Sequence, residues 1–216
     1  SKSSINNDHM LMRALYKYAR ERDLVEKDLT EFVEFPQVGA KMEKGAFTDL
    51  QIKNLEQMAR DGIPWADTVL ILCYTGFRIT EFLNLTRFSY HEDGDYLQGG
   101  IKTTAGKDRI VPVHPKIKPY LVEWLKRGGE RIICEDDGSP VSYSTYFKRF
   151  AQIADAIGAP KATPHWCRHT AASRMRMAGM EELAVKRILG HSDKVITDHY
   201  THVDIAFLSK EIRKVS

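Results

Sequence analysis

The sequence has few cysteines, no long apolar run and little net charge, and each of these limits what the chain can be. Its three cysteines are scattered and odd in number, which favours a reducing cytoplasm over a disulfide framework. No apolar run reaches the roughly 18 residues of a membrane span. The formal net charge of +3 permits a nucleic-acid partner without arguing for one. We therefore expect a cytoplasmic chain with no membrane partner, whose DNA-binding signal, if any, lies in local clusters.

The length of 216 residues suffices for one domain with a sizeable core and a short additional segment. An amphipathic helix is predicted at 6–20, followed by a charged stretch with breakers. Because one helix cannot bury its own apolar stripe, we expect 1–22 to be the last helix of a truncated upstream domain and 23–45 to be a linker. Packing of this helix on the main domain is the alternative.

Residues 46–216 carry helix and strand signals that predict a mainly helical α+β domain with a small antiparallel sheet. Thr48 and Gln51 are placed as a capping box at the first helix. Strands at 96–103 and 109–113 are predicted to form a hairpin. The other expected elements are helices at 64–72, 115–125 and 144–157, further helices that end at Gly179 and Gly190, a strand at 131–134, and a helical tail over 193–214 with a break near Asp204.

A tyrosine and several cations suggest attack on a phosphodiester. Ionising the phenol of Tyr200 at neutral pH costs roughly 4 kcal/mol, which nearby cations would lower. Attack builds negative charge on the phosphate oxygens, and the planar fork of arginine can hold two of them. Arg78 and Arg168, from distant parts of the chain, are candidates to clamp one phosphate. His165 lies three residues before Arg168, so both fall on one helical face.

Other interpretations of the same residues, which involve no phosphate chemistry, stay open. Taken alone, Tyr200 is explained more simply as a core or surface tyrosine than as a nucleophile. The segment around Arg78, taken alone, is explained as the end of a helix with a surface arginine. His165 and His169 are four apart and suggest a metal site, but no acidic third ligand lies nearby and Arg168 between them is a poor neighbour for a cation. The joint order of these residues, rather than any one of them, favours the phosphate chemistry.

Six segments together resemble the tyrosine recombinase (phage integrase) family, over about 46–216. Within that family the chain most resembles integrases of phages and conjugative transposons of Gram-positive bacteria. The matching segments are YTGFRITE at 74–81, IKT at 101–103, RIVP at 109–112, TPHWCRHTAAS at 163–173, LGHS at 189–192 and DHYTHV at 198–203.

The resemblance implies a site-specific recombinase that integrates or excises a mobile element. Tyr200 would attack a DNA phosphate to form a 3′-phosphotyrosine bond, and a 5′ hydroxyl of a partner duplex would then attack that bond. Four protomers would act on two duplexes through a Holliday junction, without metal, ATP or other cofactor. Glu81 would support the site, and Lys107 is an alternative to Lys102 as general acid. The residues carried over as the phosphate-activating set are Arg78, Lys102, His165, Arg168 and His191.

The resemblance also predicts a DNA interface and a tail contact. Major-groove contact is expected from the helix that carries Tyr143, Ser144, Thr145, Lys148 and Arg149. Candidates for phosphate contact are Lys107, Arg109, Lys161, Arg174 and Arg176. A tail helix from about 204 is expected either to dock on a neighbouring protomer or to pack on its own domain. Alternatives for the whole chain are a type IB topoisomerase-like or resolvase activity, or a catalytically silent DNA-binding module.

Overall fold

The computed structural model describes residues 2–34, 45–100, 108–190 and 205–216, and it divides into two units, 1–43 and 44–216. The first unit consists of helix α1 (Lys2–Arg20) and a 3₁₀-helix, η1 (Leu29–Phe32), which packs on it. Asp28 caps η1, because its carboxylate accepts the backbone N–H of Thr30 at 2.9 Å. No helix in these ranges is both long and apolar enough to cross a membrane.

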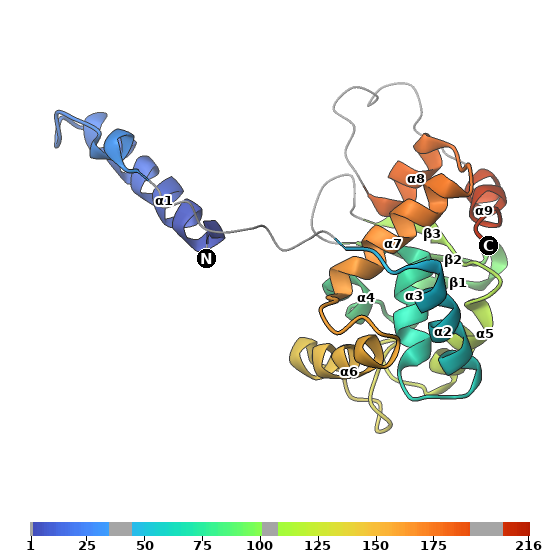
Figure 1. Cartoon of the computed structure of the whole chain (residues 1–216). Helices are drawn as coiled ribbons and strands as arrows, with labels where there is room; N and C mark the ends of the chain where they lie inside the picture. The colour runs from blue at the N-terminus through green and yellow to red at the C-terminus, as the bar shows by residue number, and fades with distance from the viewer. Residues whose placement is uncertain (1, 35–44, 101–107, 191–204) are drawn as a thin grey trace. The chain divides into compact units, whose positions relative to one another are not determined.

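The second unit combines helices with a three-stranded antiparallel sheet, which confirms the predicted α+β class (Figure 1). The strands lie in the order β1–β2–β3, and Leu97 faces Val111 across the last pair. The helices and strands of the second unit are α2 (Asp49–Arg60), α3 (Ala66–Thr75), α4 (Ile79–Leu83), η2 (Arg87–Ser89), β1 (Tyr90–His91), η3 (Glu92–Gly94), β2 (Tyr96–Gly99), β3 (Arg109–Pro112), α5 (Lys118–Lys126), α6 (Tyr143–Ala156), α7 (Pro164–Met177), α8 (Glu182–Leu189) and α9 (Ile205–Ile212).

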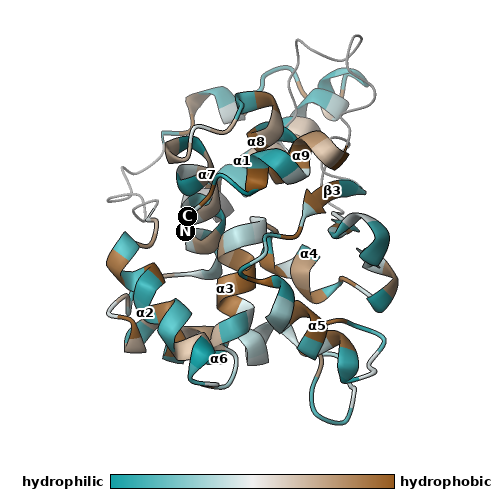
Figure 2. Cartoon of the chain, turned by 90° about the vertical axis from the view of Figure 1, so that its right-hand side faces the viewer, coloured by the Kyte–Doolittle hydropathy of each residue, from teal (hydrophilic) through white to brown (hydrophobic). Residues whose placement is uncertain are grey.

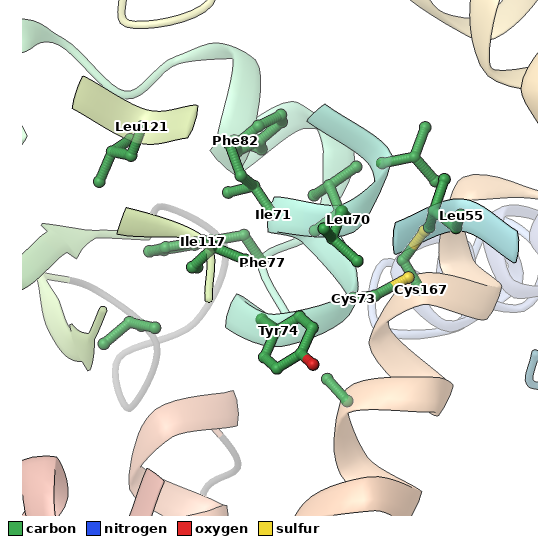
Figure 3. Close-up of a cluster of buried hydrophobic side chains, with 14 of the residues drawn as sticks. Leu55, Leu70, Ile71, Cys73, Tyr74, Phe77, Phe82, Ile117, Leu121 and Cys167 are labelled. Atoms are coloured by element: carbon green, nitrogen blue, oxygen red, sulfur yellow. The ribbon is translucent and has the colours of Figure 1, made fainter. Parts of the chain in front are cut away.

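Helix α3 forms the centre of this unit. Nearly all of its residues are buried, and α2 and α7 are its main neighbours (Figure 1). Figure 2 shows mainly white and brown along α3, in contrast to the mixed teal and brown of α2, which buries one face only. Side chains of α3 and α4, among them Leu70, Ile71 and Phe82, meet Ile117 and Leu121 in the core (Figure 3). A helix that is apolar all round belongs inside a domain, so α3 is a fixed frame for the loops at its ends.

Two local signals in the sequence determine where helices begin and end. The capping box of α2 is present: the backbone N–H of Gln51 donates to the Thr48 hydroxyl at 3.3 Å, and the Gln51 side chain accepts the N–H of Thr48 at 3.0 Å. Gly76 ends α3 with a left-handed φ of 66°. A Cβ at Gly76 would lie 2.6 Å from a Leu189 methyl carbon, so only glycine permits this close approach to the end of α8.

Several expected boundaries were wrong. The strand at 131–134 is replaced by two isolated bridges, Thr86–Arg131 and Cys134–Pro140. Helix α3 starts at Ala66, after Trp65 in a left-handed conformation, and α5 starts three residues after Pro115. The short elements α4 and β1 were not predicted, because five residues or fewer are too short to show a helical or strand period.

Two leucines on α2 provide a test of this core. Leu55 is fully buried and Leu50 is 68% exposed. We expect Leu55→Ala to lower the free energy of unfolding by about 2–5 kcal/mol, because it leaves a cavity against α3. Leu50→Ala, the same change on the same helix, should stay within about 0.5 kcal/mol. Urea denaturation measures both, and equal losses would contradict the assigned packing of α2.

Candidate active site and nucleic-acid interface

Arg78 and Glu81 form an ion pair directly after the central helix. The turn at Gly76 and Phe77 leads from α3 into α4, and Arg78 immediately precedes α4. The backbone N–H of Arg78 donates to Glu81 Oε2 at 3.0 Å, and its Nη1 donates to Oε1 at 2.8 Å. The Glu81 side chain is 2% exposed and that of Arg78 is 24% exposed. The buried Glu81 carboxylate therefore fixes the Arg78 guanidinium, while part of the Arg78 side chain faces solvent.

A second arginine, Arg109, reaches the same carboxylate from β3. Its Nη2 donates to Glu81 Oε2 at 2.8 Å and its Nε donates to the carbonyl of Ile188 at 2.9 Å. The guanidinium lies 4.5 Å from the ring centroid of Phe77, within range of a cation–π interaction. Glu81 thus accepts hydrogen bonds from two arginines that are distant in sequence.

These contacts fix the charge of Glu81. Burial alone would raise the pKa of its carboxyl group, but the hydrogen bonds from Arg109 and from the backbone and side chain of Arg78, with the charge of Arg109, lower that pKa to about 2. Glu81 is therefore an anion at neutral pH and has no proton to donate.

Arg168, on α7, is a third arginine beside this pair. Its Nη1 donates to the carbonyl of Gly76 at 2.7 Å and its Nη2 to the carbonyl of Leu189. Burial, and then the neighbouring charges of Arg78 and Arg109, lower its pKa to about 10, so it remains charged at neutral pH. The two carbonyls belong to the C-terminal ends of α3 and α8, and Arg168 therefore ties these ends together.

The result is a cluster of three guanidinium groups with one carboxylate. Two of them, on Arg109 and Arg168, are buried. A guanidinium has five N–H donors, and the two carbonyls account for only two of those on Arg168. The excess of positive charge and of donors suits an anion with several oxygens, such as a phosphate diester.

His165 lies one turn before Arg168 on α7 and is exposed. Its ring packs edge-on against His169, with centroids 4.7 Å apart. Within the described ranges, no three histidine, cysteine, aspartate or glutamate side chains are grouped to hold a metal ion. The alternative of a metal site at His165 and His169 therefore gains no third ligand there.

Four predicted site residues, Lys102, Lys107, His191 and Tyr200, lie outside the described residues. The segment that carries His191 and Tyr200 joins Gly190 to Ile205. Gly190 ends α8 with a φ of 65° and directly follows Leu189, whose carbonyl Arg168 contacts. Ile205 begins α9, and both α8 and α9 pack on β3. Both ends of the segment are thus anchored on elements that border the arginine cluster.

The predicted DNA-reading helix is α6. Ser142 caps it, because its hydroxyl accepts the backbone N–H of Thr145 at 3.0 Å. Ser144 and Lys148 are exposed, and Tyr143 is 51% exposed. Arg149 is engaged instead: both of its Nη atoms donate to Glu135, at 3.0 and 2.9 Å, and its guanidinium lies 4.0 Å from the Trp65 ring centroid. The side chains exposed for a contact are therefore those of the first turn and Lys148.

The predicted phosphate contacts do not all face solvent. Lys161 is exposed. Arg176 is paired with Glu182 at 3.1 Å, and Arg174 donates to the carbonyl of Ser216. Arg109 differs most from a surface phosphate contact: its side chain is 3% exposed, and its Nη2 and Nε donate to Glu81 and to the carbonyl of Ile188. Val111, two residues further along β3 and therefore on the same face of the strand, is fully buried as well.

Comparison with known proteins places this fold in a class. Residues 46–206 match the phage integrase family. The chain is 26% identical to tyrosine recombinase XerD of Halalkalibacterium halodurans, over 94% of this chain and 72% of that protein. Its structure resembles the Tn1549 transposon integrase in complex with circular intermediate DNA, with a TM-score of 0.72, 22% identity, and 98% and 79% of the two chains covered. It also resembles a lambda integrase tetramer bound to a Holliday junction, with a TM-score of 0.69, 17% identity, and 91% and 61% covered.

The chain therefore belongs to the phage integrase family. Its catalytic domain is that of a site-specific tyrosine recombinase, as predicted from the six matching segments.

Replacing Glu81 tests the charge assigned to the cluster. We expect Glu81→Gln to lower the free energy of unfolding at neutral pH by about 3 kcal/mol, because the carboxyl pKa falls from 4.5 to about 2 on folding. This contribution is present above pH 4.5 and is lost as the pH falls toward 2, so the two proteins should converge in acid. Urea denaturation across this range measures it, and a difference that grows in acid would contradict the assignment.

Proposed function

We propose that this chain cleaves and rejoins DNA strands through a covalent bond between Tyr200 and a DNA phosphate. The observation that carries the proposal is the cluster of Arg78, Arg109 and Arg168 around one buried carboxylate. One carboxylate offsets only part of the positive charge of three guanidinium groups, so the cluster favours the binding of a further anion. A phosphate of the DNA backbone supplies that anion.

In this proposal Arg78 and Arg168 hold the two non-bridging oxygens of the scissile phosphate. Negative charge on these oxygens grows as the attacking oxygen approaches phosphorus, and preorganised donors are the largest source of stabilisation available. Arg168 is held by the carbonyls of Gly76 and Leu189, and Arg78 by Glu81, so neither must reorganise during the reaction.

The remaining groups would move protons. The Oη of Tyr200 forms a bond to phosphorus while the bond from phosphorus to the 5′ oxygen breaks. Lys102, or Lys107 in its place, protonates the departing 5′ oxygen. His165 accepts the proton that Tyr200 loses, or it donates a hydrogen bond to the phosphate while that proton passes to solvent; His191 donates a hydrogen bond to the same phosphate. A 5′ hydroxyl of a partner duplex then reverses the step, and neither a metal ion nor ATP is required.

Double-stranded DNA is the proposed partner, read by α6 and held by four protomers on two synapsed duplexes. The lambda integrase tetramer bound to a Holliday junction supports this assembly by likeness of fold. In the present structure α9 packs on its own domain: Leu208 and Ile212 are buried, and Glu211 accepts the backbone N–H of Glu181 at 2.7 Å. Exchange of this helix between protomers, which we also propose, would have to break these contacts. Integration or excision of a mobile element stays a prediction.

We propose further that α1 is the last helix of a core-binding domain. Met10, Leu11, Leu15 and Tyr18 are all more than half exposed, and these side chains would pack against the rest of such a domain. Residues 23–45 would then link it to the catalytic domain.

A trapping assay tests the chemistry. The chain is mixed with supercoiled plasmid in EDTA, quenched with SDS and examined for protein attached to a DNA 3′ end. We expect an adduct with the unmodified chain and none with Tyr200→Phe, because phenylalanine lacks the attacking oxygen. Tyr120→Phe, on α5, is the matched control and should still form the adduct. An adduct that persists in Tyr200→Phe would show that another residue is the nucleophile.

The salt dependence of DNA binding tests the interface. If about six phosphates are contacted, the logarithm of the affinity should fall with the logarithm of salt concentration with a slope near −5. Lys148→Ala should make this slope shallower by about 1. Lys126→Ala, which removes a similarly exposed lysine from α5, should leave it unchanged. Fluorescence anisotropy with a random-sequence duplex measures the slopes, and equal effects of the two variants would exclude α6 from the interface.

A further inference from the structure

Arg109 is a buried cation whose contacts lead to both of the arginines proposed to hold the phosphate. Toward Arg78, its Nη2 donates to Glu81 Oε2, and the same carboxylate accepts two hydrogen bonds from Arg78. Toward Arg168, its Nε donates to the carbonyl of Ile188, and the carbonyl of the next residue, Leu189, is the acceptor of Arg168. The Arg109 guanidinium therefore contacts the carboxylate that holds Arg78 and the carbonyl next to the one that holds Arg168.

The position of Arg109 is itself fixed. It opens β3, where Gly99 of β2 pairs with it, and its guanidinium lies over the Phe77 ring, which is fully buried. Phe77 in turn precedes Arg78 in the chain. Three segments, the β2–β3 sheet, the α3–α4 turn and the C-terminal end of α8, thus meet at this one side chain.

Arg109 and Arg78 differ in exposure and in the number of their partners. The side chain of Arg109 is 3% exposed and that of Arg78 is 24% exposed, although both pair with Glu81 at 2.8 Å. The Arg109 guanidinium already contacts the Glu81 carboxylate, the Ile188 carbonyl and the Phe77 ring. Without Arg109, the Glu81 carboxylate would keep only Arg78 as a partner and would be free to rotate about its terminal torsion. The planar fork of arginine can satisfy a carboxylate and a carbonyl at once, which a single ammonium group does with poorer geometry.

We propose that Arg109 is a positioning residue of the recombination reaction, which sets the direction of Arg78 through Glu81 and the place of the Leu189 carbonyl through Ile188. The inference rests on the proposed function only where it concerns catalysis. The statement that Arg109 orders Arg78 can be tested without DNA. The alternative is a purely structural ion pair that stabilises the fold and has no effect on the site.

Three variants and one control separate these cases. Arg109→Met removes the charge and keeps an unbranched apolar chain, and Arg109→Lys keeps the charge and loses the fork. The double variant Arg109→Met/Glu81→Gln removes both partners of the buried pair. Arg127→Met is the matched control, because Arg127 also pairs with a carboxylate, Asp136 at 2.9 Å, and also lies over an aromatic ring, Trp124 at 3.8 Å.

The first readout is the order of the Arg78 Nε–H group, measured by NMR relaxation on the free chain. The NMR order parameter S² is about 0.85 for rigid backbone groups and below about 0.6 for flexible ones. On that scale, we expect Arg109→Met to lower the order parameter of the Arg78 Nε–H group from the rigid to the flexible range. Arg127→Met should leave it unchanged and Arg109→Lys should lie between. An Arg78 group that stays as ordered in Arg109→Met as in the unmodified chain would overturn the proposal.

The second readout is the rate of covalent adduct formation on supercoiled plasmid in EDTA, with affinity for a random-sequence duplex measured separately. A misplaced phosphate ligand can cost about 100-fold in rate, and we expect a loss of that order for Arg109→Met with affinity within about threefold. Partial recovery in Arg109→Lys is expected. In the Glu81→Gln background the same change should cost far less than it does alone, because residues that act through one another are not additive.

Each outcome decides between the cases. A loss in Arg109→Met no larger than in Arg127→Met, or full additivity with Glu81→Gln, would contradict a positioning role. Circular dichroism measures the folded fraction of each variant. If the rate of adduct formation falls only in proportion to that fraction, Arg109 stabilises the fold and does not position the site. If even the unmodified chain forms no adduct, the proposed function fails, while the NMR comparison still determines whether Arg109 orders Arg78.

Discussion

The buried carboxylate of Glu81 is the interaction on which the arrangement of the site depends. Three guanidinium groups, from α7, from β3 and from the residue before α4, could not lie side by side in a desolvated site without a compensating anion. Glu81 supplies it, and the two arginines bonded to it hold its pKa at about 2. Its negative charge is therefore permanent at neutral pH, and it lets the fold keep its arginines in place before any DNA phosphate is bound.

Backbone carbonyls hold the arginine that Glu81 does not hold. Arg168 makes no ion pair with Glu81 and is held by the carbonyls of Gly76 and Leu189. Both carbonyls lie at C-terminal ends of helices, where the helix dipole carries partial negative charge that favours a cation. The central helix α3 therefore contributes to the site twice, through the carbonyl after its last turn and through Arg78 two residues later. Core packing and phosphate chemistry are linked at this turn, where a Cβ on Gly76 would clash with Leu189.

The sequence predicted the class of fold, because that class depends on local signals: capping residues, helical spacing and short motifs. The joint action of Arg78 and Arg168 on one phosphate was inferred from the order of the motifs and stays a prediction. The sequence placed Glu81 correctly beside Arg78 because three residues make one helical turn. It could not predict that Arg109 is buried against Glu81, since that contact joins segments 28 residues apart and depends on how β3 packs. A basic residue next to a hairpin loop resembles a phosphate contact until tertiary packing shows which face it occupies. The short elements α4 and β1 were missed for the same reason, because packing rather than periodicity defines them.

The most direct test of the central claim is the structure of the Tyr200→Phe chain bound to duplex DNA. We expect Arg78 and Arg168 to donate to the non-bridging oxygens of one and the same phosphate, with Arg109 still bonded to Glu81. If the two arginines contact different phosphates, or if Arg109 leaves Glu81 to contact DNA, then the cluster is not a preformed phosphate site and the proposed roles of all three arginines are wrong.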